Sequence, residues 1–239
     1  MSHSDPPVSG VRPARTIVDT IQFGTTTPGE LSVPARNTGT VILLTPLLGC
    51  GVGEQTSLAH RLNDQGLATL TVALVTRNSH PVDRTTLPAL AQRLADIAEW
   101  APSEPQLAGR PCGCLAAASE AAVALMAAAH RPRCLDALVI VAGRTDLIEP
   151  QLALVEAPTL LVEGGSDEAD LQRARTALGI LPGDADLTIV AGLDEAAVAE
   201  SACRQVADVA GRWFRQHFAA AIDSPTWQID HEVAVDSRP

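Results

Sequence analysis

Short apolar runs alternate with longer amphipathic stretches along most of this chain, and the two patterns predict different elements. The segment 40–44, TVILL, is apolar throughout, which is typical of a strand buried on both faces of a sheet. The segment 87–101 instead places Leu90, Leu94 and Ile97 at helical spacing. The same patterns predict strands at 68–75, 112–115, 137–141, 159–162 and 186–190, and helices at 54–64, 119–129, 168–178 and 196–219.

The order of these elements predicts the fold class. Strands at 16–23 and 30–33 are joined by a turn rich in Thr, Pro and Gly, which favours an antiparallel opening hairpin. Strands and helices then alternate with short links, which predicts a mostly parallel sheet with helices on both faces. We expect an α/β protein with one domain over 14–220, a disordered N-terminal arm over 1–13 and a flexible C-terminal tail over 221–239.

Charge and composition exclude several classes of partner. A net charge of −11 repels phosphate backbones, and a chain with no tyrosine, three phenylalanines and three tryptophans offers few rings for base stacking. We therefore expect no nucleic-acid partner. No apolar run is long enough to cross a bilayer, and the first residues do not look like a secretory signal. We expect no membrane partner and a cytoplasmic location.

The cysteines and glycines give no sign of a cofactor. The five cysteines lie mostly in apolar segments, and Cys112 and Cys114 share one strand face without a second pair at metal-binding spacing. They are interpreted as buried, reduced thiols. The glycine-rich segment 49–53 lacks both the dinucleotide-binding spacing and the lysine of a phosphate-binding loop. We expect no cofactor and no metal.

Four segments carry the most specific patterns. The segment 111–132, PCGCLAAASEAAVALMAAAHRP, predicts a buried strand, a tight turn at 116–120 and an alanine-rich helix. The others are VIVAGRTDL, APTLLVEGGSDE and DLTIVAGLDE. Together they resemble the dienelactone-hydrolase-like branch of the α/β-hydrolases, particularly small members that also occur fused to phosphoribosyltransferase domains. The resemblance covers roughly Val18 to Phe218 and implies the α/β-hydrolase fold.

The resemblance places the catalytic elements of that family on residues that cannot perform the same chemistry. The family's G-x-S-x-G elbow falls on Ala116-Ala117-Ala118-Ser119-Glu120, so the serine position holds Ala118. The acid falls on Asp167 and the histidine on Glu195. The loop that helps to bind the oxyanion, commonly H-G-x-G, reads PLLG at 46–49. The resemblance therefore implies a degenerate triad and favours a pseudohydrolase over an enzyme.

Two residues near the elbow are alternative nucleophiles. Ser119 lies one residue past the turn apex, where a helical step turns its side chain away, and a helix cap is the favoured role. Cys50 lies in a loop near the strand ends, but no histidine is placed to activate it. An esterase or lactonase that uses either residue is the competing hypothesis.

The histidines do not supply a base at the expected place. His217 and His231 follow the last strand too late, in the final helix and the tail. His130 closes the elbow helix, where a partial positive charge suits the helix dipole, and His60 and His80 lie in a helix and a loop. All are interpreted as surface or capping residues, except that a tail histidine reaching the cleft is a minor alternative.

The acidic residues and the Arg144–Asp146 pair have structural and functional interpretations. Asp167 opens a predicted helix and is a natural cap; the alternative joins it to Glu195 and Glu120 in a cation site. Arg144 and Asp146 match a family turn and are expected to brace it by ion pairing.

Without chemistry to perform, the elbow at Ala118 is expected to relax, or Glu120 to force the helix start outward.

The sequence thus favours an inactive α/β-hydrolase-fold protein with a binding, scaffolding or regulatory role. Its expected partner is a protein or a small ligand in the vestigial pocket, and it is a candidate homo-oligomer.

Overall fold

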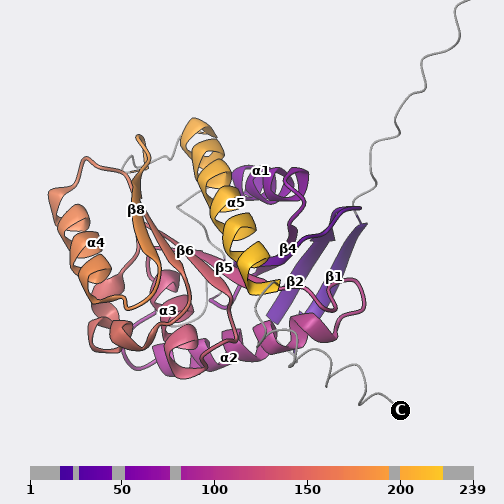
Figure 1. Ribbon diagram of the computed structural model, residues 1–239, viewed down its shortest axis with the longest axis horizontal. Coiled ribbons are helices and arrows are strands. Elements are labelled where there is room, and N and C mark those ends of the chain that lie inside the picture. The colour runs from indigo at the N-terminus through magenta and orange to yellow at the C-terminus, as the bar shows by residue number, and fades with distance from the viewer. Residues whose placement is uncertain (1–16, 24–26, 45–51, 76–81, 194–199, 223–239) are drawn as a thin grey trace, which may run out of the picture.

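The computed structural model describes residues 17–23, 27–44, 52–75, 82–193 and 200–222 (Figure 1). Several parts of the chain discussed above lie outside the described residues. They are the N-terminal arm, most of the C-terminal tail, residues 46–51 with Cys50, and the single residues His80, Glu195 and His231. The strands are β1 Ile17–Phe23, β2 Thr27–Val33, β3 Thr40–Leu44, β4 Ala68–Val72, β5 Cys112–Ala117, β6 Ala137–Val141, β7 Thr159–Glu163 and β8 Ala185–Ile189. The helices are α1 Val52–Asp64, α2 Leu87–Trp100, α3 Glu120–His130, α4 Glu168–Ile180 and α5 Glu200–Ile222, with 3₁₀ turns η1 Ala101–Ser103, η2 Thr145–Leu147 and η3 Glu149–Leu154.

The strands form one eight-stranded sheet in the order β1-β2-β4-β3-β5-β6-β7-β8. β2 pairs antiparallel with β1 and β4. The other six strands, β4, β3, β5, β6, β7 and β8, run parallel to one another. The predicted fold class and the opening hairpin are therefore confirmed. The predicted limits of β3 and β6 match the structure, whereas β4 ends at Val72 rather than at residue 75.

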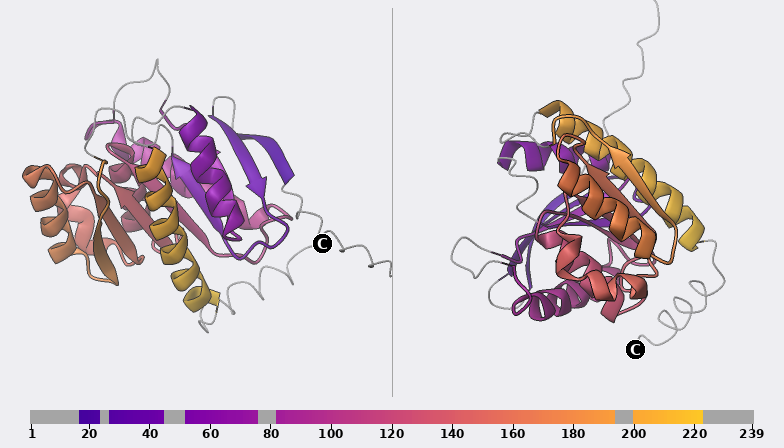
Figure 2. Two further views of the ribbon diagram at one scale, coloured as in Figure 1. Left: turned by 90° about the horizontal axis from the view of Figure 1, so that it is seen from above. Right: turned by 90° about the vertical axis from the view of Figure 1, so that its left-hand side faces the viewer.

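Helices cover both faces of the sheet (Figures 1 and 2). Val41 and Leu43 of β3 belong to the core cluster beneath α1 and α5, while Ile42 and Leu44 belong to the cluster beneath α2, α3 and α4. Alternate residues of a strand point to opposite faces, so a strand covered on both sides must be apolar throughout. All five residues of β3 are buried.

Helix α5 approaches the sheet closely at Gly113 of β5. A Cβ on Gly113 would lie 2.6 Å from the Phe214 ring and 2.8 Å from the carbonyl oxygen of Ala137. The missing side chain therefore makes room for a buried phenylalanine. Gly66 lies just after α1 with a φ of +82°, a conformation that glycine adopts at low cost.

On the outer strand β8, one main-chain N–H that points away from the sheet is hydrogen-bonded by a side chain of the same strand. Val190 donates its N–H to Glu163 of β7, so the N–H of Leu187, three residues earlier, faces the open edge. The side chain of Asp186 accepts that N–H at 2.8 Å. No helix within the described ranges is both long and apolar enough to span a bilayer.

Candidate functional site

The turn between β5 and α3 is a sharp elbow with Ala118 at its apex. β5 ends at Ala117 and α3 begins at Glu120, so only two residues join them. Ala118 has a φ of +49°, in the left-handed region that costs a non-glycine residue about 1–2 kcal/mol. It is exposed, although Ala117 before it is buried. The elbow therefore presents a methyl-bearing residue at the surface.

Hydrogen bonds from the neighbouring strand hold this conformation. The N–H of Ala118 donates to the carbonyl of Val141 at 3.0 Å, and its own carbonyl accepts the N–H of Arg144 at 2.9 Å. Ala142, the residue after Val141, also has a positive φ of 46°, and its N–H donates to the carbonyl of Val162 at 2.9 Å. The prediction that the elbow would relax is wrong, because these contacts fix both sides of Ala118.

Ser119 and Glu120 follow the apex and interact with each other. Ser119 occupies the position before α3, but its hydroxyl makes no cap hydrogen bond and donates to Oε2 of Glu120 at 3.1 Å. The predicted capping role is therefore wrong. The predicted outward displacement by Glu120 is also wrong, since Glu120 is only 5% exposed as the first residue of α3.

Burial changes the acidity of the elbow carboxyl group. Desolvation raises the pKa of Glu120, and hydrogen bonds from its own backbone N–H and from Ser119 oppose that shift. Ser119 is half-buried beside it. The elbow therefore combines an exposed methyl group, a hydroxyl and a carboxyl group that holds its proton more tightly than in water.

Asp167 caps α4, as one of its two interpretations predicted. Its Oδ1 accepts the N–H groups of Ala169 at 2.8 Å and Asp170 at 3.3 Å. Within the described ranges, no group of three or more His, Cys, Asp and Glu side chains could hold a metal ion. A cation site with Glu195 stays a prediction, because Glu195 is not described.

Arg144 and Asp146 brace the turn after β6, as expected. Nε and Nη2 of Arg144 each donate to a different carboxylate oxygen of Asp146 at 2.8 Å. Hydrogen bonds and charge from Arg144 lower the pKa of Asp146.

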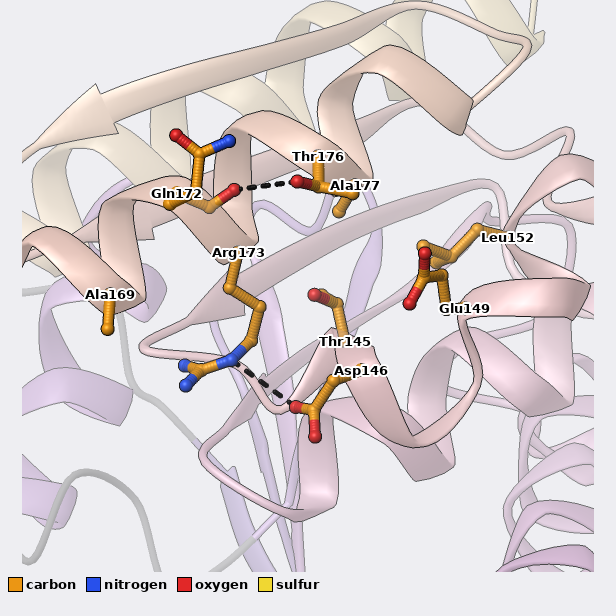
Figure 3. A pocket seen from close by; sticks show the side chains of 9 residues that line it. All are labelled: Thr145, Asp146, Glu149, Leu152, Ala169, Gln172, Arg173, Thr176 and Ala177. Atoms are coloured by element: carbon orange, nitrogen blue, oxygen red, sulfur yellow. Dashed lines mark hydrogen bonds and ion pairs between the residues drawn. The ribbon is translucent and has the colours of Figure 1, made fainter.

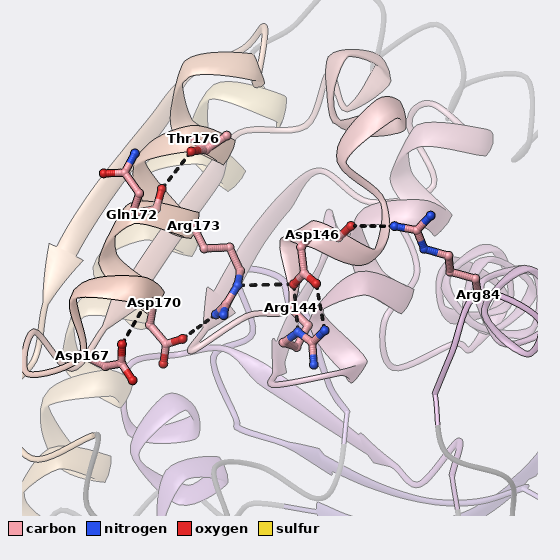
Figure 4. A network of polar contacts seen from close by, with 8 residues as sticks. All are labelled: Arg84, Arg144, Asp146, Asp167, Asp170, Gln172, Arg173 and Thr176. Atoms are coloured by element: carbon pink, nitrogen blue, oxygen red, sulfur yellow. Dashed lines mark hydrogen bonds and ion pairs between the residues drawn. The ribbon is translucent and has the colours of Figure 1, made fainter.

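Sequence reasoning missed two further contacts of Asp146 (Figure 4). Arg173 of α4 forms an ion pair with Asp146 at 3.3 Å and a second with Asp170 at 2.6 Å. Arg84 donates to the carbonyl of Asp146 at 3.5 Å. The turn after β6 is thereby joined to α4 and to the segment before α2, by partners remote in the sequence.

The described histidines lie apart from the elbow chemistry. His130 and His60 are exposed, as predicted. His217 is not a surface residue: it is 7% exposed, its ring lies 4.2 Å from that of Trp213, and burial lowers its pKa. The error arose because His217 falls on the face of α5 that packs against the sheet.

The thiols near β5 are poorly suited to nucleophilic attack. Cys112 and Cys114 are buried and belong to the same core cluster, as predicted, and desolvation raises the pKa of both. Desolvation also raises the pKa of Cys134 to about 12. The thiolate is the reactive form, so these three residues are interpreted as structural.

A groove lies between α4 and the η2–η3 segment, one strand away from the elbow (Figure 3). It encloses about 200 Å³. Its lining, here called the α4 groove, consists of Thr145, Asp146, Glu149, Leu152, Ala169, Gln172, Arg173, Thr176 and Ala177. Sequence reasoning did not anticipate it, because it depends on how η3 packs beside α4.

Several proteins of known structure share this arrangement of strands and helices. The chain matches the dienelactone hydrolase of Anabaena variabilis with a TM-score of 0.70 and 29% identity, over 87% of this chain and 100% of that one. It matches the esterase domain of a Rhodothermus marinus protein with a TM-score of 0.65 and 13% identity, over 85% and 100% of the two chains. A cold-adapted esterase from an Arctic intertidal metagenomic library matches with a TM-score of 0.64 and 14% identity, over 91% and 100%.

Proteins that are related to this chain in sequence carry a different name. The chain is 34% identical over 197 residues to proteins from two strains of Mycobacterium tuberculosis that carry the name phosphoribosyl transferase. The match covers 79% of this chain but 43% of those relatives, so the chain spans less than half of their length. No family model matches. The sheet order, the opening hairpin and the structural neighbours establish that this chain has the α/β-hydrolase fold.

Proposed function

We propose that this protein is a pseudohydrolase: an α/β-hydrolase-fold protein without serine-hydrolase catalysis that serves a binding, scaffolding or regulatory role. The observation that carries the proposal is the elbow itself. A positive-φ turn raises the residue at its apex above the sheet, and here that residue is Ala118, whose methyl group cannot attack a carbonyl.

The surrounding groups do not replace the missing nucleophile. A serine hydrolase needs a hydroxyl that donates to an imidazole, which is in turn oriented by a carboxylate. Ser119 donates to Glu120 instead. Of the three described imidazoles, those of His60 and His130 are exposed, and that of His217 lies against the Trp213 ring. The carboxylate of Asp167 binds its own helix.

Ester hydrolysis tests the proposal directly. The full chain is incubated with short-chain p-nitrophenyl esters and, separately, with a fluorophosphonate probe that labels activated serines. We expect no labelling, and no turnover above that of Ser119→Ala. Turnover that is lost in Ser119→Ala or Cys50→Ala, with folding retained, would overturn the proposal.

One contact favours the competing esterase or lactonase. Glu120 accepts the Ser119 hydroxyl at 3.1 Å, and a carboxylate with a raised pKa is a stronger base than an exposed one. In that alternative Ser119 attacks and Glu120 takes its proton. Glu120→Gln would then abolish turnover in parallel with Ser119→Ala, whereas a pseudohydrolase has no turnover for either change to remove.

We do not extend the transferase name of the Mycobacterium relatives to this chain. The matched part is less than half of those proteins, and in this chain that part forms a hydrolase-type sheet. We propose that any phosphoribosyl transfer by those relatives depends on the unmatched part. A transferase-type protein is accordingly one candidate partner for the present chain.

A further inference from the structure

We propose that this protein forms a two-fold symmetric dimer, in which β1 of one copy pairs antiparallel with β1 of a second copy. The pairing would join the two sheets at the margin remote from β8 (Figure 1). Strands β2, β4 and β3 lie between β1 and the elbow strand β5, so the proposal does not depend on the chemistry of the elbow.

The hydrogen bonds of the neighbouring strands show which main-chain groups of β1 face outward. Ala68 of β4 donates its N–H to the residue before β3, so the next residue, Thr69, faces β2, where it pairs with Ser32. Leu31, beside Ser32, therefore faces β1 and pairs with Asp19. Because main-chain groups alternate along a strand, the residues on either side of Asp19 face the open edge.

Three residues of β1 present main-chain groups at this edge. They are Val18, Thr20 and Gln22, and each offers one N–H and one C=O. Within the described residues, no other strand, side chain or loop bonds these groups, unlike the outward N–H of Leu187 on β8. Edge strands are commonly blocked by proline, lysine or a bulge, and β1, with the sequence IVDTIQF and a continuous register, has none of these.

The edge of β1 complements itself, which identifies the second strand as another copy of the chain. A two-fold axis through Thr20 pairs Val18 with Gln22 of the second copy, and Thr20 with its own equivalent. Each such pair exchanges two hydrogen bonds in an antiparallel sheet. This single register bonds all of the outward N–H and C=O groups of both copies, and the symmetry provides the match on both sides at once.

The exposed apolar side chains of β1 also fit this register. Ile17 is 49% exposed and would lie opposite Phe23 of the second copy. Phe23 is half-buried with its ring 4.8 Å from that of Trp100, so Ile17 would extend the apolar contact of this aromatic pair. Val18 is 57% exposed and would lie beside Gln22 on the other face. The dimer would therefore shield both residues from water.

The one charged residue of β1, Asp19, limits the strength of the dimer. In this register Asp19 lies opposite Ile21 of the second copy, and the two Asp19 carboxylates lie diagonally across the axis. Like charges at that spacing repel, and salt screens the repulsion. Contact through one strand from each copy gives a small interface, so we expect a dissociation constant of about 100 μM that falls as salt is added.

Analytical ultracentrifugation of the full chain over about 1–500 μM tests the proposal. Thr20→Pro removes the central outward N–H, and an edge strand tolerates proline where the N–H faces solvent. We expect this variant to fold and to dimerise at least about tenfold more weakly. Thr20→Val keeps the N–H and should dimerise as wild type does. Asp19→Asn should tighten the dimer by about threefold.

Cross-linking tests the register and still decides the matter if Thr20→Pro does not fold. Thr20→Cys would place two thiols on facing residues with Cα atoms about 5.5 Å apart, a separation that a disulfide accepts. Air oxidation should link this variant into dimers. Glu30→Cys, at an exposed position on β2, is the control and should stay unlinked. A monomer at all concentrations, a dimer that Thr20→Pro leaves intact, or equal linking of both cysteine variants overturns the proposal.

Discussion

The main-chain N–H of Arg144 donates a hydrogen bond of 2.9 Å to the carbonyl oxygen of Ala118. The same arginine binds Asp146 through its side chain, and Asp146 binds Arg173 of α4. The strained elbow after β5 is therefore connected to the helix after β7 through the turn after β6. This chain of contacts explains how a positive φ persists at an alanine.

The strain at Ala118 predicts a stabilising substitution. Ala118→Gly should raise the free energy of unfolding by about 1 kcal/mol, because glycine adopts a positive φ without the Cβ penalty. Denaturant unfolding measures the change. Ala117→Gly, in the adjacent extended and buried position, should instead destabilise by about 1 kcal/mol. If both variants lose stability equally, Ala118 is not strained in solution.

Restoring two side chains should restore hydrolysis. The resemblance aligns Ala118 with a catalytic serine and Glu195 with a histidine, so Ala118→Ser alone supplies a hydroxyl without its base. We expect p-nitrophenyl acetate hydrolysis at the uncatalysed background rate from the single variant, and hydrolysis about a hundredfold above that rate from Ala118→Ser with Glu195→His. Equal rates for the single and double variants would show that residue 195 is not the base position.

The buried carboxyl group of Glu120 predicts a pH dependence of stability. Folding raises its pKa above the ordinary value of 4.5, so the folded state binds this proton more tightly than the unfolded chain does. The resulting stabilisation is present below 4.5 and is lost as pH rises through the folded pKa. Glu120→Gln should therefore gain stability relative to wild type as pH rises, until the difference levels off.

Urea unfolding at several pH values between about 4 and 8 measures this difference. Glu30→Gln, at an exposed position on β2, is the matched control and should show a flat difference. A difference for Glu120→Gln that shrinks as pH rises would mean that the folded state favours the charged form.

The contact between β5 and α5 predicts an intolerant glycine. Gly113→Ala should destabilise the protein by about 1–3 kcal/mol, because the new methyl group would meet the Phe214 ring and a backbone oxygen. Gly179→Ala in α4 is the control, since nothing lies within 4 Å of its Cβ position and alanine favours helix. Thermal unfolding compares the two variants. Equal melting temperatures would contradict the close contact between Gly113 and Phe214.

The sequence predicted the fold well because its signals were local. The apolar run at 40–44 and the position of Gly66 determine β3 and the end of α1 through side-chain burial and backbone freedom. Asp167 was correctly interpreted as a cap because its partners lie two and three residues away. Each of these features depends on neighbours in the chain.

The site was predicted less well because its contacts are not local. The strain at Ala118 depends on Val141 and Arg144, more than twenty residues away in the chain, and no local pattern reports them. The burial of His217 depends on which side of α5 meets the sheet. The α4 groove requires η3 and α4 to be positioned together, and sequence periodicity carries no such information.

The carboxylate of Asp186 sits where the carbonyl of an added strand would have to bind Leu187. A second copy approaching β8 edge to edge would have to displace that carboxylate and bring its own acidic residue alongside. Pairing of β8 with an added strand is thus opposed at Leu187 by the loss of a hydrogen bond and by the approach of like charges.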